Sequence, residues 1–352
     1  MSIATSWTKT TSILLCLVAC KGKTSQSDTS NGSLGEQRLG LCDIYGIEGT
    51  SADSLGRGQD GWIQLAKNLG VPIVRPHRSQ GHVFSWNVVD NGGESYDFTL
   101  TDIVVDTITR NELDLLVTVY PKADLSIEAN HRMDVIDLEI EGDPQDYAAF
   151  VQALAERYDG DGVDDMPGLE RPVDAWEAGN EPYCPSGDSE CYDRQYELLQ
   201  YTADAIHAAD PNATVLPAGA RPVFMGTAHD QVTGDWMVGE DAEIWQALFD
   251  RGALDLVDAF SFHLQVGSTE VHVDDYIEYW REQVGNKPLW ITETGVYGGD
   301  GFTDTDDPIG WTNDHLQTAF DRDVDTVLWC WWEQIRQRPD LFDALSAFTK
   351  QG

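Results

Sequence analysis

The sequence predicts one large α/β domain, a (β/α)8 TIM barrel, over residues 39–352. Short apolar runs alternate with amphipathic stretches along this range, as expected for strands that alternate with helices. Two of the runs end in an amide or a carboxylate, and a parallel barrel keeps its functional groups at the carboxyl ends of its strands. No linker-like segment interrupts the range, so we expect a single domain.

Eight runs have the length and composition of buried parallel strands, which are apolar over almost their whole length. The run at 113–120 is the clearest of them. In chain order the predicted strands are 39–45, 71–75, 113–120, 173–180, 213–218, 256–263, 288–295 and 326–331.

The stretches between these runs repeat their apolar residues at helical spacing. One face of the first predicted helix carries Trp62, Leu65, Ala66 and Leu69. The predicted helices are 60–69, 100–110, 146–158, 191–209, 241–251, 273–284, 309–322 and 341–349, and residues 121–145 are expected to form a long loop.

The charge of the chain restricts its partners. It has 61 acidic and 22 basic residues, a net charge of −39, and 41% hydrophobic residues, which is enough for a sizeable core. A surface so acidic repels nucleic acid and anionic lipid, so we expect neither as a partner. It favours high solubility, including in saline surroundings.

Residues 1–20 are predicted to be a lipoprotein-type signal peptide. Their apolar run, 13–19, is too short to span a bilayer as a helix. Residues 17–20 (Leu-Val-Ala-Cys) resemble a bacterial lipobox, in which Cys20 receives the lipid; an ordinary secretory signal with a chance cysteine is the alternative. Residues 21–38 are then a flexible tether, rich in Ser, Thr and Gly, and the protein is expected to be exported and lipid-anchored to a bacterial membrane.

Export would place the remaining cysteines in an oxidising compartment. Cys184 and Cys191 lie seven residues apart, directly after Glu181, and are predicted to form a disulfide that pins this loop. Cys42 and Cys330 lie in the first and last predicted strands, which are neighbours in a closed barrel. They are expected either to bond or to remain buried free thiols.

Two strand ends carry the functional signal. The run 173–180 ends in Asn180, which Glu181 and Pro182 follow, and the run 288–295 contains Glu293. Three predicted strands precede the first glutamate, two lie between the glutamates and one follows. This arrangement resembles the clan of retaining (β/α)8-barrel glycoside hydrolases (clan GH-A), which has an Asn-Glu acid/base after strand 4 and a nucleophilic glutamate after strand 7. The resemblance implies that Glu181 is the acid/base and Glu293 the nucleophile, with their carboxyl groups about 5–5.5 Å apart.

The same resemblance implies two further polar contacts at strand ends. Asn180 would hydrogen-bond the sugar 2-hydroxyl, an interaction that strengthens in the transition state. Arg75, at the end of the second strand, would keep the nucleophile ionised, because a nearby cation favours the charged form of a carboxylate. The alternative for Arg75 is a purely structural role at its strand end.

Histidines end two of the predicted strands. The clan often has His-x-Tyr after its sixth strand, and this chain has His263 there without the tyrosine. His263 is expected in the site, and Tyr297 is a candidate to replace the missing hydroxyl. His77 is a further candidate for substrate binding; a packed strand-end histidine is the alternative for both histidines.

Aromatic residues end the eighth predicted strand, where the clan places a tryptophan under the sugar. Trp329 and Trp331 fall on one face by alternation, and each is a candidate platform for a pyranose ring. Packing in the core is the alternative for each.

An acidic turn at 159–165 resembles a calcium loop, but Val163 and the missing glycine at the sixth place break that pattern, so a solvated turn is the better interpretation. No metal site and no cofactor are predicted.

The sequence therefore predicts a monomeric glycoside hydrolase, cellulase-like or β-xylosidase-like, that cleaves O-glycosidic, β-linked bonds in oligo- or polysaccharides. The alternatives are a non-catalytic glycan-binding surface lipoprotein on the same barrel, and a transglycosylase. The sugar, the linkage and endo or exo action depend on loops whose sequence does not specify them.

Overall fold

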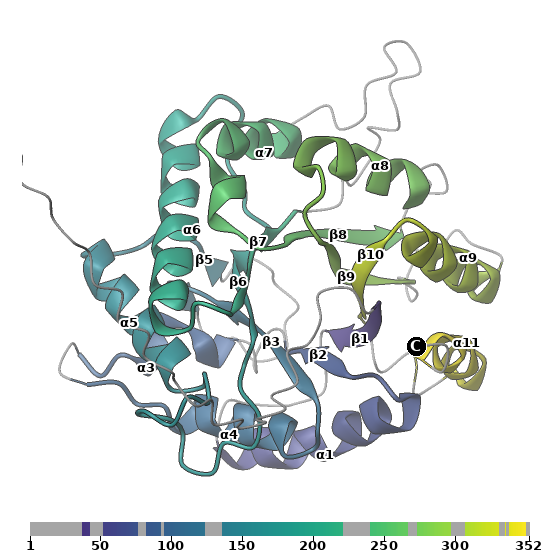
Figure 1. The fold of residues 1–352 in the computed structure, drawn as a ribbon, viewed down its shortest axis with the longest axis horizontal. Coiled ribbons are helices and arrows are strands. Elements are labelled where there is room, and N and C mark those ends of the chain that lie inside the picture. Colours follow the sequence, from purple (N-terminus) through teal and green to yellow (C-terminus); the bar gives the residue numbers. More distant parts are fainter. Residues whose placement is uncertain are drawn as a thin grey trace, which may run out of the picture. The chain divides into compact units, whose positions relative to one another are not determined.

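A computed structural model describes residues 37–42, 52–76, 82–92, 95–123, 136–220, 240–266, 273–296, 307–330, 335 and 338–349. Contacts divide the chain into two units, Met1–Ser33 and Leu34–Gly352, and the described residues all belong to the second. In this unit strands and helices alternate, with the helices arranged around the strands (Figure 1).

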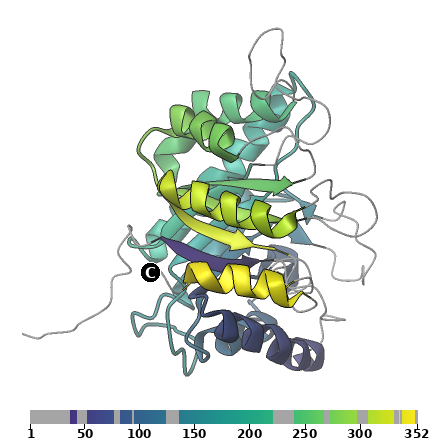
Figure 2. The same cartoon turned by 90° about the vertical axis from the view of Figure 1, so that its right-hand side faces the viewer.

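The described strands form an eight-stranded parallel sheet, β7-β6-β3-β2-β1-β10-β9-β8. It comprises β1 (Arg38–Cys42), β2 (Ile73–Arg75), β3 (Asp114–Val119), β6 (Ala175–Asn180), β7 (Thr214–Gly219), β8 (Phe260–Val266), β9 (Leu289–Val296) and β10 (Val324–Trp329). A parallel bridge between Ala220 and Phe262 joins the two ends of this order and nearly closes the sheet into a barrel. The strands all point to the same side, so their carboxyl ends meet there (Figure 2). The predicted (β/α)8 fold is confirmed.

The helices follow their strands in the predicted order. They are α1 (Ala52–Leu69), α4 (Thr99–Thr109), α5 (Pro144–Glu156), α6 (Ser189–Ala209), α7 (Glu240–Asp250), α8 (Val273–Val284), α9 (Pro308–Asp321) and α11 (Pro339–Thr349). Three of them begin at an aspartate whose carboxylate accepts a backbone N–H of the first turn, namely Asp143, Asp188 and Asp307. Such caps satisfy amides that would otherwise lack a partner at a helix start. None of the described helices is long and apolar enough to cross a membrane.

Some boundaries differ from the prediction. The sixth strand was expected from residue 256, but Ala253–Leu256 is a 3-10 helix after Gly252, whose φ of 93° turns the chain, and the strand begins at Phe260. The expected loop 121–145 contains a two-stranded antiparallel ribbon of β4 (Lys122–Ala123) and β5 (Ile136–Asp137). Two short elements, η1 (His82–Phe84) and α3 (Trp86–Val89), precede α4.

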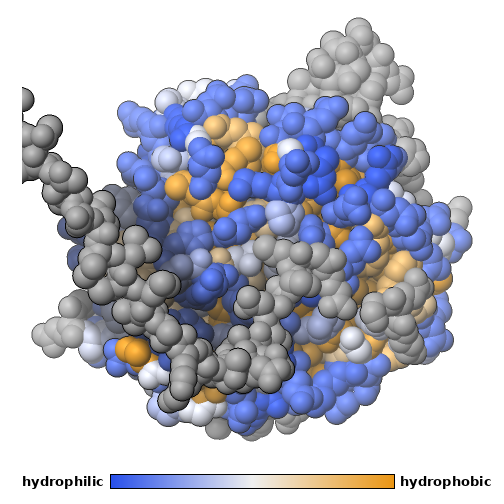
Figure 3. Space-filling view, in the orientation of Figure 1, coloured by the Kyte–Doolittle hydropathy of each residue, from blue (hydrophilic) through white to orange (hydrophobic). Residues whose placement is uncertain are grey.

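The core has two layers, because each strand is buried on both faces. The outer layer lies between strands and helices and includes Trp176, Phe262 and Trp329. The inner layer fills the barrel and consists of Cys42, Ile73, Leu116, Ala175, Leu216, Ala259, Trp290, Leu328 and Cys330. On the face drawn in Figure 3, hydrophilic residues predominate, with hydrophobic residues visible between them.

Candidate active site

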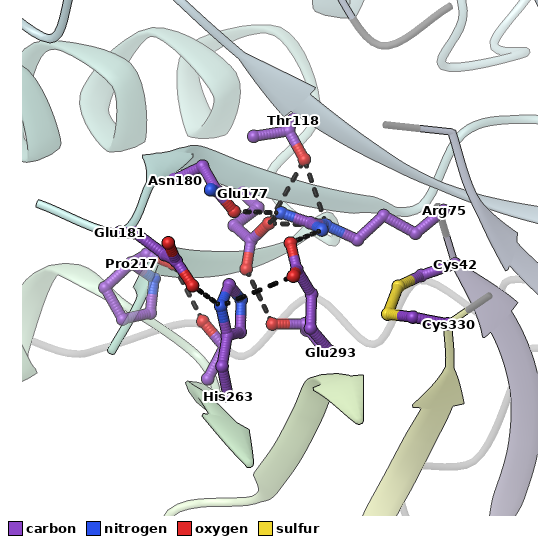
Figure 4. Close-up of polar contacts among 12 residues, drawn as sticks. Cys42, Arg75, Thr118, Glu177, Asn180, Glu181, Pro217, His263, Glu293 and Cys330 are labelled. Atoms are coloured by element: carbon purple, nitrogen blue, oxygen red, sulfur yellow. Dashed lines mark hydrogen bonds and ion pairs between the residues drawn. A yellow bond between two sulfur atoms is a disulfide. The ribbon is translucent and has the colours of Figure 1, made fainter. Parts of the chain in front are cut away.

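Polar side chains from four strands converge at the carboxyl ends of the barrel (Figure 4). Arg75 ends β2, Glu177 and Asn180 lie on β6 with Glu181 directly after it, His263 lies on β8, and Glu293 lies on β9. All of them have side chains that are buried or nearly so. A buried group of this kind lies where a parallel barrel places its chemistry.

Asn180 and Glu181 both face this site, although neighbouring residues of a regular strand face opposite sides. The backbone explains the exception. Gly179 and Glu181 have φ values of 86° and 47°, so the chain turns on either side of Asn180. A glycine fits at 179 because a Cβ there would also meet Leu138 Cδ2 at 2.8 Å. Glu181 holds a conformation that is uncommon for residues other than glycine, and such strain is typical of functional sites.

Glu293 also faces inward against simple alternation. Trp290 and Thr292 face the barrel interior, so Glu293 would face outward in a regular strand. The register between β8 and β9 shifts at this point, from Phe262 opposite Ile291 to His263 opposite Glu293. A bulge of this kind re-aims side chains beside active sites.

The outer side of this bulge is fixed by Thr294. Its hydroxyl donates to Leu264 O at 2.7 Å and lies 3.0 Å from His315 Nε2 on α9. Burial lowers the pKa of His315 to about 3, so its ring is neutral. The single hydroxyl proton of Thr294 already takes part in the hydrogen bond to Leu264 O. The Nε2–H of His315 is therefore the donor to Thr294 Oγ1.

Arg75 is the centre of the polar network and is fully buried. Its Nη1 donates to Glu293 Oε1 at 2.8 Å, its Nη2 donates to Asn180 Oδ1 at 2.7 Å, and its Nε donates to Glu177 Oε2 at 2.8 Å and Thr118 Oγ1 at 3.2 Å. Burial alone would lower the pKa of Arg75, but the charges of Glu177 and Glu293 raise it above its ordinary value. The guanidinium is therefore a permanent cation beside Glu293.

Arg75 also fixes the orientation of the Asn180 amide. A guanidinium can only donate hydrogen bonds, so the Asn180 oxygen must face it. The Asn180 NH2 group is then directed away from Arg75 and remains a donor. This is the group that the resemblance assigns to a sugar hydroxyl.

Glu177 is a site residue that sequence reasoning missed. Its carboxylate is fully buried, with Oε2 accepting from Arg75 and from Thr118 Oγ1 at 3.1 Å, and Oε1 accepting from Thr292 Oγ1 at 3.0 Å. The signal was present, since a carboxylate inside an otherwise apolar strand needs a buried cation. Glu177 is that partner of Arg75, and the pair ties β6 to β2.

His263 lies between the two predicted catalytic glutamates. Its Nδ1 is 2.7 Å from Glu181 Oε1 and 3.8 Å from Glu293 Oε2. Burial would lower the pKa of His263, but the charges of Glu293 and Glu181, together with the hydrogen bond to Glu181, raise it above its ordinary value. A protonated His263 therefore offsets part of the negative charge of this group.

The His263 ring is held closely by its surroundings. A Cβ added to Gly219 would lie 2.2 Å from His263 Nε2, so the ring fits only against a glycine. His263 Nε2 is buried, and no described residue accepts or donates a hydrogen bond there.

Two groups of described residues have the side-chain types and spacing that could hold a metal ion. Glu181, His263 and Glu293 offer ligand atoms within 4.8 Å of one another, as do Glu156, Asp159 and Asp161. In the acidic turn, Asp159, Asp161 and Asp165 accept hydrogen bonds from the backbone amides of the turn itself. That pattern agrees with the interpretation of this segment as a solvated turn.

The remaining predicted residues divide into three groups. The disulfide between Cys184 and Cys191 is confirmed, and the open question of Cys42 and Cys330 is decided, since they are bonded. The expectation of a sugar platform at Trp329 is wrong: this residue is fully buried and packs against Trp311 of α9, on the outer face of the barrel wall. The other four candidates lie outside the described residues, namely Cys20, His77, Tyr297 and Trp331.

Comparison with known proteins finds similar structures but no similar sequences. No protein-family model matches the chain, and no curated protein has a significantly similar sequence. Solved structures do match: a glucosidase from Croceicoccus marinus (TM-score 0.57, 18% identity), a family 39 glycoside hydrolase from Bacteroides cellulosilyticus (0.53, 13%) and xylanase 10B from Thermotoga maritima (0.54, 13%). Each match covers 84% of this chain, and it covers 60%, 56% and 83% of those proteins respectively.

These similarities show the fold. The chain forms a (β/α)8 barrel of the kind that glycoside hydrolases of clan GH-A have, as the sequence predicted. The chain spans less than two thirds of the length of the first two of these proteins.

Proposed function

We propose that this protein is a retaining glycoside hydrolase that cleaves β-linked O-glycosidic bonds in oligo- or polysaccharides by double displacement. One observation carries the proposal: carboxylate oxygens of Glu181, directly after β6, and Glu293, within β9, lie within 4.8 Å of each other. Retaining enzymes use carboxyl groups about 5–5.5 Å apart, whereas inverting enzymes need about 6.5–9.5 Å to admit a water molecule. The names of the structurally similar proteins, which include a glucosidase and a xylanase, support the same class.

The first chemical step uses both glutamates. Glu293, held as an anion by Arg75 Nη1 at 2.8 Å, attacks the anomeric carbon, and the bond to the leaving oxygen breaks. Glu181 transfers its proton to that oxygen, so the products are the free alcohol and a glycosyl ester of Glu293. The NH2 group of Asn180 donates to the sugar 2-hydroxyl.

The second step restores the enzyme. Glu181, now a carboxylate, takes a proton from a water molecule as that water attacks the anomeric carbon. The ester bond breaks, Glu293 regains its negative charge, and the sugar leaves with its original anomeric configuration. His263 holds Glu181 in place through the 2.7 Å contact of its Nδ1.

The two glutamates are distinguished by substituting each with alanine. Glu293→Ala should abolish cleavage of all substrates, because the proposed mechanism has no other nucleophile for its first step. Glu181→Ala should slow natural glycosides by about 10²–10⁴-fold and dinitrophenyl glycosides far less, since dinitrophenolate leaves without a proton. Glu190→Ala is the matched control, because this residue is an exposed glutamate at the start of α6.

Azide identifies the step that each glutamate serves. With Glu181→Ala and a dinitrophenyl glycoside, azide should accelerate turnover and give the β-glycosyl azide. With Glu293→Ala it should give the α-azide, because the small anion takes the place of the nucleophile. The assignment of Glu181 would be wrong if its loss slowed both substrate types equally and azide had no effect. Inactivity of the parent enzyme on aryl glycosides and on plant and algal polysaccharides would instead contradict the proposed function itself.

We also propose that Cys20 carries a lipid that anchors the exported protein to the bacterial membrane. The Leu-Val-Ala-Cys sequence at 17–20 supports this proposal. Cys20→Ser should release the protein from membranes or block its maturation. A variant that fractionates with membranes and incorporates labelled palmitate like the parent would contradict it.

A further inference from the structure

The disulfide between Cys42 and Cys330 lies inside the barrel rather than on its surface. Both cysteines are fully buried and belong to the inner layer of the core. They join the end of β1 to the residue after β10, across 288 positions of sequence. The bridge therefore closes the barrel where its first and last strands meet.

One end of the bridge adjoins Arg75. Cys42 is the register partner of Arg75 in the parallel pairing of β1 with β2. The strand β2 is only three residues long and pairs with β1 at two register positions. The position of the Arg75 backbone thus depends directly on the end of β1 that Cys42 fixes.

The other end of the bridge adjoins Glu293. The backbone N–H of Cys330 donates to Thr294 O at 2.6 Å, and Thr294 follows Glu293 in the bulge of β9. Figure 4 shows the disulfide beside both Arg75 and Glu293. The bridge thus joins the immediate neighbours of the two residues whose side chains form the 2.8 Å ion pair.

From this placement we infer that the Cys42–Cys330 disulfide is a positioning element for catalysis. It holds Arg75 on β2 and Glu293 on β9 in register across the paired strands β1 and β10 that lie between them. The inference rests on the proposed role of Glu293 as nucleophile. Without the bridge, β1 and β10 keep their backbone hydrogen bonds, but their ends can move apart. Glu293 then loses both its alignment for attack and its constant contact with Arg75.

Two consequences separate positioning from a merely structural role. Misplacement of a reacting group by about 1 Å can cost about 10²-fold in rate, so kcat should fall about 10–100-fold with little change in KM. In addition, the acidic limb of the kcat/KM profile should move to higher pH, because a cation that contacts a carboxylate less closely favours its charged form less.

The test replaces the bridge while keeping the inner layer apolar, in two variants, Cys42→Ala/Cys330→Ala and the better-filled Cys42→Val/Cys330→Ala. The double variant that folds, or both if both fold, is studied as the full-length protein. Amide hydrogen exchange and pH–rate profiles on an aryl glycoside are measured. Two control variants are compared with the variants that lack the Cys42–Cys330 bridge. Leu328→Ala removes packing from the same inner layer without cutting a bridge, and Cys184→Ala/Cys191→Ala cuts the other bridge.

We expect faster exchange in β2 and β9, lower kcat and the shifted acidic limb only when the inner bridge is absent. Unchanged exchange in β2 and β9 would overturn the inference whatever the activity. Faster exchange with an unchanged kcat and pH profile would overturn it too, as would the same effects in Leu328→Ala. An inactive parent enzyme would refute the proposed function and this inference together, whereas an active parent with insensitive bridge variants would refute the inference alone.

Discussion

Removal of the Arg75 guanidinium should destabilise the whole barrel, and the structure gives the size of the effect. Arg75→Met keeps much of the apolar volume, but it leaves the fully buried Glu177 carboxylate without its cation and Glu293 without its main contact. Loss of one partner of a buried ion pair costs about 3–5 kcal/mol in free energy of unfolding. For an unfolding entropy that scales with about 310 residues, this corresponds to a fall in Tm of about 5–8 °C.

The assay is guanidinium unfolding followed by tryptophan fluorescence, with a double-mutant cycle to assign the cause. Glu177→Gln removes the unpaired charge, so Arg75→Met/Glu177→Gln should regain about 2 kcal/mol or more of what Arg75→Met loses. Arg110→Met is the surface control, since its exposed i,i+4 pair with Asp106 contributes about 0.3–0.5 kcal/mol. The reasoning is refuted if Arg75→Met costs no more than Arg110→Met, or if the double variant is no more stable than Arg75→Met.

Three further variants test other contacts. The folded state raises the pKa of His263, so the protonated ring contributes stability that is complete below about pH 6.5 and disappears as pH rises through the folded value; His263→Asn should therefore lose more free energy of unfolding at pH 6 than at pH 9, and an equal loss at both would contradict this. Gly219→Ala should push the His263 ring away from Glu181, costing about 1–3 kcal/mol and lowering kcat, whereas Gly61→Ala, with open space at its Cβ, should be neutral or stabilising in thermal unfolding. Cys184→Ala/Cys191→Ala should lower the free energy of unfolding in denaturant by about 2–3 kcal/mol, the value for so short a loop, and no loss would mean that the bridge does not restrict the unfolded chain.

The sequence was sufficient for the barrel and for the expectation that Glu181 and Glu293 lie in one site, because both leave local signals. Parallel strands buried on both faces are continuous apolar runs, and Asn180-Glu181-Pro182 marks a strand end unmistakably. Arg75 could be placed because it ends such a run. His263 was expected at the end of its strand, but β8 continues beyond it to Val266.

What the sequence did not reveal depends in part on deviations from regular geometry. The inward turn of Glu293 comes from a bulge, and bulges are set by neighbouring strands rather than by the bulged residue. Trp329 faces outward by regular alternation, since Leu328 and Cys330 on either side of it belong to the inner layer. The sequence indicated that Trp329 and Trp331 share a face, but not which face of the barrel wall it is. Glu177 was overlooked because one carboxylate in an apolar strand acquires meaning only when a cation from another strand is opposite it.

The bridge between Cys42 and Cys330 makes nearly the whole barrel a covalent ring of chain. A protease that cuts any single loop within that ring would leave two fragments that stay joined, so a nicked molecule would run as one species until it was reduced. The ring can also close only when both its first and its last strand are present. Oxidation of this pair would therefore be a late event in the life of the chain, after β10 has formed and paired with β1.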